Sequence, residues 1–393
     1  MPLDFQLKAA IVFLIFLSIF VFLNRKKLAT HGLFPLFYFS MYKTRFGIKF
    51  MDYFSKKFRK LLVFIGYAGI AIGFIGMAIL SFSLVQNIYN LFTKPEAAPG
   101  VGLVLPFEVK GAVFVPFFYW IISIFIIALV HEFAHGIIAR AHDVKVKSSG
   151  FAFLEILIPI IPAAFVEPDE KVLRKKSHRQ QLSVFAAGPL ANIILAFIVI
   201  GLSYSIVSPL VDSMVENKGV KITDFVEGDF PAQKSGISKD DIITEIDGKK
   251  ILTLDDFSNI LQNKTPETTI ELKTNKSDYS IVLAKNPEDE KKAYLGVYVQ
   301  QNRKIKDSFK EGLGSFVPAA ILWTAGLFYW LIILNLGIGL FNLVPIGPLD
   351  GGRMLQLVCH KFFDIEKGNK VWYNVSLGFL FLVIANIVFA FIK

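Results

Sequence analysis

The chain has 393 residues, of which 54% are hydrophobic and only 19% are charged. An ordinary soluble domain has roughly a quarter of its residues charged, so this composition excludes a simple soluble protein. The net charge is +10, yet residues 212–310 carry −2, and the positive excess lies in short loops beside hydrophobic segments. That distribution is typical of membrane proteins in a lipid bilayer and argues against nucleic-acid binding. The single cysteine, Cys359, excludes an intramolecular disulfide.

Six hydrophobic segments are long enough, or nearly so, for the roughly 20 helical residues that cross a bilayer. They cover residues 9–23, 61–92, 113–140, 182–210, 314–344 and 373–392. The first segment runs directly into basic residues without a small-residue cleavage site, which predicts an uncleaved anchor. Residues 150–166 are apolar but short and contain two prolines. They predict a re-entrant or β-hairpin segment, which needs protein or a watery cavity around it.

The charges of the loops orient the spans. Residues 24–60 contain ten Lys and Arg and one acidic residue, whereas residues 93–112 contain two of each sign. The positive-inside rule makes the first loop cytoplasmic and the second external. Alternation then places residues 141–181 inside, and residues 212–310 and both termini outside.

Residues 212–310 differ in character from the rest of the chain. Alternating apolar residues and turn signals such as Asp247-Gly248 predict short strands. Thr253 is a candidate N-cap for a helix with Phe257, Ile260 and Leu261 on one face. We therefore expect a polytopic α-helical membrane protein with a small inserted α+β domain. Its parts are residues 1–112 (N-terminal membrane region), 113–211 (first half of the core), 212–310 (insert) and 311–393 (second half of the core and the last span).

The sharpest chemical signal is His131-Glu132-Phe133-Ala134-His135, within the span at 113–140. On a helix, residues i and i+4 share a face, so both imidazoles can converge on one zinc ion while Glu132 reaches a metal-bound water. Ionisable residues inside a membrane are costly and usually functional. The alternative is that these side chains face lipid headgroups at a helix end.

A catalytic zinc takes three protein ligands, so a third ligand should lie at membrane depth. Asp350 is the candidate, because it follows an apolar span where Pro345, Gly347 and Pro348 break the helix. A broken helix is tolerated in a membrane only around a buried or watery site. The alternative is an interfacial turn residue, since Asp-Gly is a common turn.

These motifs resemble the site-2 protease family of intramembrane zinc metalloproteases. The resemblance covers residues 110–355 and rests on the His-Glu-x-x-His motif, on residues 188–192 (Gly-Pro-Leu-Ala-Asn) and on residues 341–345 (Phe-Asn-Leu-Val-Pro) leading into Leu-Asp-Gly at 349–351. It implies that His131, His135 and Asp350 bind one Zn²⁺ per chain and that Glu132 is the general base. The family often has Pro-x-Pro before Leu-Asp-Gly, whereas this chain has Gly347 at the second of these positions.

The resemblance also implies a function. The expected reaction is hydrolysis of peptide bonds within or near transmembrane helices of membrane protein substrates, as in regulated intramembrane proteolysis. A helix hides its carbonyls in hydrogen bonds, so cleavage needs local unwinding. If residues 150–166 form strands, they can pair with the unwound segment.

Parts of the insert, residues 219–222, 231–237 and 241–248, resemble a PDZ domain. Bacterial and archaeal members of the family often carry one on the external side. This implies a prokaryotic cell membrane, with the active site towards the cytoplasm and the PDZ-like domain extracytoplasmic. PDZ domains bind an extended peptide ligand at a sheet edge, expected here near Val220 to Ile222. The alternative is a folded spacer.

Three further motif residues are candidates for binding the substrate or the oxyanion: Asn192, Asn342 and Pro345. For Asn192 an interhelical hydrogen bond is the alternative, since Asn commonly serves this purpose between spans. We expect Gly188-Pro189 to interrupt the helix just before it. We interpret the four remaining histidines as solvated and without function: His31, His142, His178 and His360.

The second span contains a series of glycines, Gly66, Gly69, Gly73 and Gly76. Their spacing is compatible with close helix contact or with kinking.

Two other function classes remain at this point. A catalytically silent PDZ-bearing membrane binding protein or chaperone would keep zinc as a clamp, but a structural zinc needs four protein ligands and no base. A transporter would also have ionisable residues at depth, but the sequence shows no inverted repeat. The intact Glu132 between two helical histidines favours the protease.

Overall fold

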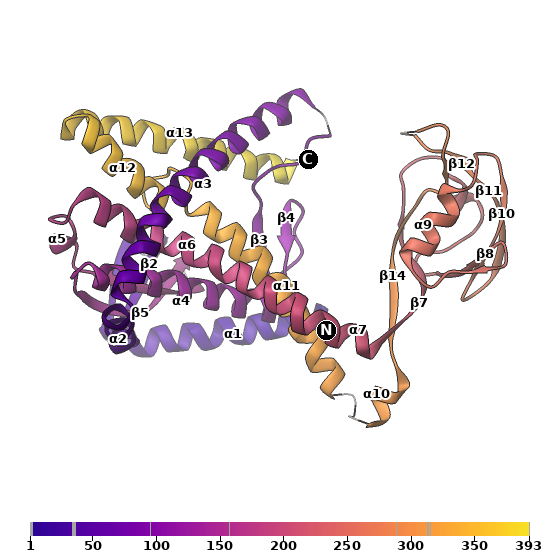
Figure 1. Ribbon diagram of the computed structural model, residues 1–393, viewed down its shortest axis with the longest axis horizontal. Coiled ribbons are helices and arrows are strands. Elements are labelled where there is room, and N and C mark those ends of the chain that lie inside the picture. The colour runs from indigo at the N-terminus through magenta and orange to yellow at the C-terminus, as the bar shows by residue number, and fades with distance from the viewer. Residues whose placement is uncertain are drawn as a thin grey trace. The chain divides into compact units, whose positions relative to one another are not determined.

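The structure is a computed structural model. It describes residues 3–33, 37–94, 96–156, 158–287, 289–312, 314 and 316–392. It divides into two compact units. The membrane unit comprises Met1–Ser203 and Gly326–Lys393, and the second unit comprises Tyr204–Ala325. Figure 1 labels the elements of both, and each unit is considered by itself below.

Six helices in the described part of the chain are long and apolar enough to cross a membrane, which confirms the predicted number. Their cores are α1 (Leu3–Asn24), α3 (Arg59–Thr93), α4 (Phe117–Ala141), α6 (His178–Leu202), α11 (Phe316–Phe341) and α13 (Ile365–Ile392). A π-helical turn, Ser203–Val207, joins α6 to α7 (Ser208–Met214). Shorter elements of the membrane unit are α2 (Ile48–Lys57), β3 (Leu103–Leu105), β4 (Ala112–Phe114), α5 (Glu170–Leu173) and α12 (Asp350–Phe362).

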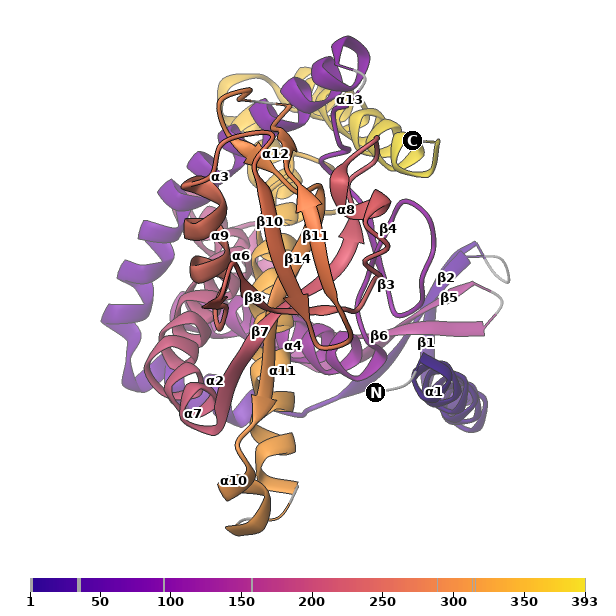
Figure 2. The ribbon, with the colours of Figure 1, turned by 90° about the vertical axis from the view of Figure 1, so that its right-hand side faces the viewer.

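The membrane unit also contains an antiparallel sheet in the order β1-β2-β5-β6. Its strands are β1 (Leu28–Leu33), β2 (Phe37–Thr44), β5 (Val146–Ile156) and β6 (Ile158–Pro168). Of the two structures expected for the apolar segment at residues 150–166, a re-entrant segment or a β-hairpin, the strands β5 and β6 form the β-hairpin, which extends over residues 146–168. Figure 2 shows this sheet beside α1, and β6 lies at one edge of it.

Strands β1 and β2 are missing from the sequence prediction, which treated residues 24–60 as a loop. Met41 of β2 lies opposite Ala152 of β5, and Phe39 lies opposite Leu154. Aromatic and β-branched residues along residues 37–44 are the local signal that was overlooked. Their partner strand lies more than a hundred residues away, which no local pattern reveals.

The glycines of α3 lie in close helix contacts. A Cβ atom added to Gly66 would be 3.2 Å from Cβ of Ser183, and one added to Gly69 would be 2.9 Å from Leu190, both on α6. A Cβ on Gly73 would be 2.9 Å from Met354 of α12. These clearances support the close-contact interpretation, and α3 runs unbroken for 35 residues.

The insert has a sheet in the order β11-β10-β8-β7-β14, whose strands lie side by side in Figure 2. Its elements are β7 (Val215–Phe225), α8 (Pro231–Lys234), β8 (Ile242–Ile246), β9 (Lys249–Lys250), α9 (Leu254–Gln262), β10 (Thr269–Thr274), β11 (Asp278–Val282), β12 (Ala284–Lys285), β13 (Ala293–Tyr294), β14 (Val297–Ile305) and α10 (Asp307–Gly312). Thr253 caps α9 as predicted, since its side chain accepts the Asp256 N–H at 3.1 Å. Phe257 of this helix packs into the core, with Ile260 and Leu261 against it.

One prediction about the insert is wrong. Val220 to Ile222 do not lie at a sheet edge, because β7 pairs with β8 on one side and with β14 on the other. The outermost strands are β11 and β14. Strand order depends on long-range pairing, whereas the sequence shows only that a strand is present.

Candidate metal centre

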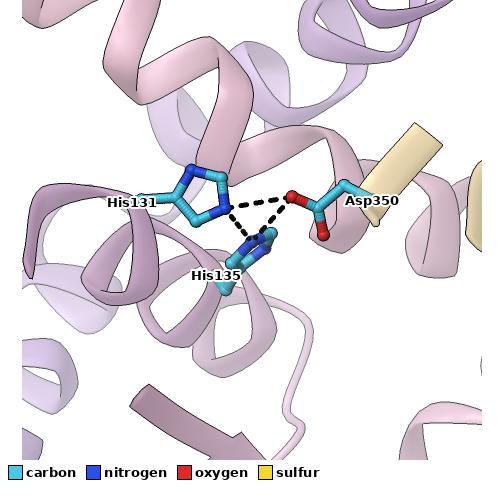
Figure 3. Close-up of side chains that lie close together, drawn as sticks. All are labelled: His131, His135 and Asp350. Atoms are coloured by element: carbon cyan, nitrogen blue, oxygen red, sulfur yellow. Dashed lines mark hydrogen bonds and ion pairs between the residues drawn. The ribbon is translucent and has the colours of Figure 1, made fainter. Parts of the chain in front are cut away.

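Helix α4 brings the two histidines of the His-Glu-x-x-His motif onto one face, as their spacing requires. The Nε2 atoms of His131 and His135 lie 3.1 Å apart. Oδ2 of Asp350 is 3.0 Å from the first and 3.3 Å from the second. Figure 3 shows the three side chains pointing toward one another. Each is largely buried, with 10–12% of its side chain exposed.

Asp350 reaches this point because the first turn of α12 packs tightly on the loop before it. The Gly351 N–H donates to the Asn342 carbonyl at 2.8 Å. A Cβ atom on Gly351 would collide with the carbonyl of Leu343, and one on Gly352 with the carbonyl of Ile346. The two glycines after Asp350 are therefore required by the close approach of two backbone segments.

Helix α6 fixes the far side of both rings. Nδ1 of His135 lies 2.7 Å from the Val184 carbonyl and donates to it, so that in the neutral ring Nε2 carries no proton and can bind a metal. Nδ1 of His131 lies 3.1 Å from the amide nitrogen of Asn192, whose Oδ1 is buried without a partner. Turning this amide by 180° lets Oδ1 accept the Nδ1–H of His131 and satisfies the orphaned oxygen. Such partners hold metal-binding imidazoles in the correct tautomer.

The same helix leaves room for the rings at Gly188. A Cβ atom at this position would lie against Nε2 of both His131 and His135. Gly188-Pro189 does not interrupt the helix, contrary to prediction, because α6 continues with Pro189 inside it. The sequence signal was correct about a special position but wrong about its cause, which is space for two imidazoles.

Glu132 lies beside the cluster, where its Oε2 accepts the backbone N–H of Val166 in β6 at 3.0 Å. A cavity of about 710 Å³ is lined by Glu132, His131, His135, Asp350 and Asn342. Charged side chains also line it, namely Lys147, Glu167, Glu170, Lys171, Arg174 and Arg353. Several of these are exposed, so the cavity is open to water.

The other candidates lie around the cavity in different ways. Asn192 is fully buried and makes the interhelical hydrogen bond that was the alternative to a substrate contact. Asn342 lines the cavity, and its Nδ2 donates to the Ile338 carbonyl at 3.1 Å. Pro345 is buried in the loop before Asp350 and is not part of the cavity lining.

One histidine that was interpreted as solvated is buried. His142 is 3% exposed, and its Nε2 lies 2.8 Å from Oγ of Ser183. It links the end of α4 to α6, a contact between distant segments that the sequence does not reveal. The surroundings of His142 contain no second metal-binding group among the described residues.

The residues of the cluster fit a zinc ion. One ligand atom from each of His131, His135 and Asp350 lies within 4.8 Å of the others. Two imidazole nitrogens and one carboxylate, with the carboxylate of Glu132 nearby, match the three-ligand set of catalytic rather than structural zinc sites.

The family model described as "Peptidase family M50" matches residues 119–383. The chain belongs to peptidase family M50. It is an intramembrane zinc metalloprotease of the site-2 protease type and a Zn²⁺ enzyme, which removes the binding-protein and transporter alternatives.

Several known proteins are similar to parts of this chain. An uncharacterized protein of Methanocaldococcus jannaschii is 31% identical over 320 residues, which are 80% of this chain and 75% of that protein. Zinc metalloprotease RasP of Geobacillus kaustophilus is 24% identical over 282 residues, 58% of this chain and 63% of that one. Among solved structures, the PDZ domain of an SdrC-like protein from Listeria monocytogenes is similar at 22% identity, with a TM-score of 0.19, over 21% of this chain and 87% of that one.

Proposed function

We propose that His131, His135 and Asp350 hold the zinc ion and that Glu132 is the general base for peptide hydrolysis. The observation that carries this proposal is the convergence of three ligand atoms from two distant segments, with both histidine Nδ1 atoms anchored on α6. When bound, zinc lowers the pKa of a water molecule and polarises the peptide carbonyl.

The protein residues have separate tasks in this reaction. A carboxylate oxygen of Glu132 takes the proton of the attacking water and returns it to the leaving amine nitrogen. Asn192 and the Val184 carbonyl keep the two imidazoles in position and in the ligand tautomer. Asn192 acts through His131, to which it is hydrogen-bonded. Asn342 lines the cavity and is therefore the better candidate for contact with the substrate.

The substrate is a transmembrane helix of another protein, which must unwind locally before its carbonyls are accessible. Strand β6 supports this step. It lies at the sheet edge, and Phe165, Val166 and Glu167 line the cavity. The Val166 N–H points away from β5 and toward Glu132. An unwound substrate segment added along β6 would therefore lie beside the proposed base.

The insert supplies a separate peptide site, and it uses β14 rather than the β7 residues first expected. A cavity of about 460 Å³ is lined by Phe257 and Leu261 of α9 together with Lys292 and Val299. Strand β14 is an outermost strand of the sheet among the described residues, so an extended peptide can add to it while an apolar side chain enters this cavity.

The loop charges support the orientation given above. In this orientation the cavity opens toward the cytoplasm, the insert is extracytoplasmic, and the enzyme lies in a prokaryotic cell membrane. The four parts 1–112, 113–211, 212–310 and 311–393 remain our assignment of function along the chain, with the catalytic core divided by the insert.

The zinc content of the purified protein tests the ligand set. We expect about one zinc per wild-type chain and a large loss in both His135→Ala and Asp350→Ala. His178→Ala and Asp255→Ala are matched controls, because both side chains are exposed and lie outside the motifs. Full zinc occupancy in Asp350→Ala would contradict the assignment. Glu132→Gln should keep zinc but abolish cleavage of a reconstituted transmembrane substrate.

A further inference from the structure

Helix α2 has one buried face and one exposed face. Met51 and Ser55 are buried against the membrane unit, with Met51 fully covered. Phe50 and Tyr53, by contrast, are 48% and 55% exposed. Lys49 and Lys56, seven residues apart, lie on the same exposed face as these rings. A helix that packs on protein with one face and exposes basic and aromatic side chains on the other is typical of one that lies in a membrane interface.

In the described part of the chain, no carboxylate neutralises the lysines of this exposed face. Four exposed lysines have no carboxylate partner among the described residues: Lys49, Lys56, Lys57 and Lys60. The one acidic residue of α2, Asp52, pairs with Arg140 of α4. Lys57 lies over the rings of Tyr53 and Phe58, at 5.3 and 5.4 Å. The surface therefore has an uncompensated positive charge interleaved with aromatic rings.

The position of α2 brings this charge to the bilayer surface. The helix ends at Lys57, and the membrane-crossing helix α3 begins at Arg59. Basic residues directly beside a span attract anionic headgroups, and each one adds to the attraction. Phe50 and Tyr53 are side chains suited to the boundary between headgroups and acyl chains.

α2 also packs on the half of α4 that carries the second histidine. The sulfur of Met51 occupies the space beside Gly136, where an added Cβ would be 2.5 Å away. The ring of Phe133, inside the His-Glu-x-x-His motif, lies 6.2 Å from that of Phe46 and 6.3 Å from that of Phe50. A shift of α2 would therefore move its contacts with Phe133 and Gly136, the residues that flank Ala134 and His135 in α4.

We propose that α2 and the first residues of α3 bind the anionic phospholipid headgroups of the bilayer, and that this docking stabilises the metal-binding half of α4. The lipid site follows from the unpaired lysines and exposed aromatic rings beside a span. It requires neither the proposed ligand roles nor a particular side of the membrane.

The test uses the full chain in an uncharged detergent, titrated with phosphatidylglycerol or phosphatidylcholine. Phosphatidylglycerol should raise the thermal unfolding temperature of the wild type and remain bound in native mass spectra, whereas phosphatidylcholine should have no comparable effect. The variant K49Q/K56Q/K57Q/K60Q should need about tenfold more phosphatidylglycerol or more for the same shift. A matched control, K249Q/K250Q/K285Q/K291Q, removes four exposed lysines of the insert and should respond like the wild type.

A second measurement tests the link to α4. Phosphatidylglycerol should slow the release of zinc to a soluble chelator in the wild type, and Met51→Ala should keep lipid binding but lose most of this protection. The proposal is overturned if the lysine variant responds to phosphatidylglycerol like the wild type, which would place the lipid elsewhere. Equal effects of both lipids, or binding of an acidic peptide but not of phosphatidylglycerol, would also overturn it. If the wild type holds no zinc, the ligand assignment fails, while the lipid titration still decides the headgroup site.

Discussion

The membrane unit and the insert place their large apolar side chains in opposite positions. In the insert, alternating residues such as Ile270 and Leu272 are fully buried. In α3, large apolar side chains such as Phe64 and Phe82 are 69% and 67% exposed, while the glycines are inside. The insert is stabilised by removing apolar surface from water. The membrane unit gains little from this effect, because lipid is as apolar as its side chains, and it depends on close contact instead.

The polar groups follow the same division. The insert carries most of its charges at the surface, in ion pairs such as Lys221–Asp240 and Lys264–Asp247. The membrane unit brings three ionisable side chains together beside one cavity, where His131, His135 and Asp350 meet. We therefore expect the stability of the insert to be most sensitive to a loss of side-chain volume. The membrane unit should be most sensitive to added side-chain volume at its glycines.

The largest effect is expected at Gly188. Gly188→Val would push a side chain against Nε2 of both histidines, so zinc content should fall from about one per chain to nearly none. Gly201→Val on the same helix is the matched control, because an added Cβ there meets nothing within 4 Å. Zinc analysis after gel filtration measures both. Normal zinc in Gly188→Val would mean that the rings are not held as described.

Truncation in the core of the insert should have the next largest effect. Ile246 is fully buried, so Ile246→Ala should destabilise the insert by about 2–5 kcal/mol. Phe64→Ala on the lipid-facing side of α3 should change stability by about 0.5 kcal/mol or less. Hydrogen exchange of each segment against denaturant compares the two in the full chain. Similar losses at both positions would contradict the division between the units.

Added volume between spans should have a moderate effect. In Gly69→Leu the new side chain meets Leu190, 2.9 Å from the Cβ position, and overpacking of this kind costs about 1–3 kcal/mol. The neighbouring Ala68 is exposed, so Ala68→Leu should leave the thermal unfolding temperature unchanged. Thermal unfolding in detergent measures the difference. A Gly69→Leu variant as stable as Ala68→Leu would show that α3 and α6 do not pack closely.

The smallest effect is expected from a charge pair in the insert. Burial tends to raise the pKa of Asp241, but its bonds to Lys276 and to the Ser238 N–H outweigh this and hold the pKa below the ordinary 3.8. Because the pKa is lowered by folding, the stabilisation is present above pH 3.8 and declines as the pH falls below it. Asp241→Asn should lower the free energy of unfolding of the insert by about 1 kcal/mol at neutral pH. The variant should also lose less stability than the wild type as the pH falls.

A pH series of insert stability by hydrogen exchange separates this variant from a control. Asp255→Asn changes an exposed side chain in the same domain and should keep the wild-type decline at low pH. If Asp241→Asn and the wild type declined in parallel, the ion pair with Lys276 would not contribute to stability.

Local patterns in the sequence determined much of this protein. Segment length and composition specified six spans, because each crossing helix must satisfy its backbone groups within itself. The i, i+4 spacing specified the two histidines on one face, and the Thr253 cap specified the start of α9. Each of these features depends on residues within a few positions of one another.

The tertiary structure decided the features that depend on distant residues. It paired β2 with β5, placed β7 inside the sheet of the insert, buried His142 against Ser183 and brought Asn192 to His131. It also explained Gly188 as space for two rings rather than as a helix break. The physical reason is that strand partners, ring tautomers and clearances are set by contacts across the fold. The composition and spacing of a single segment contain no information about which distant segment will meet it.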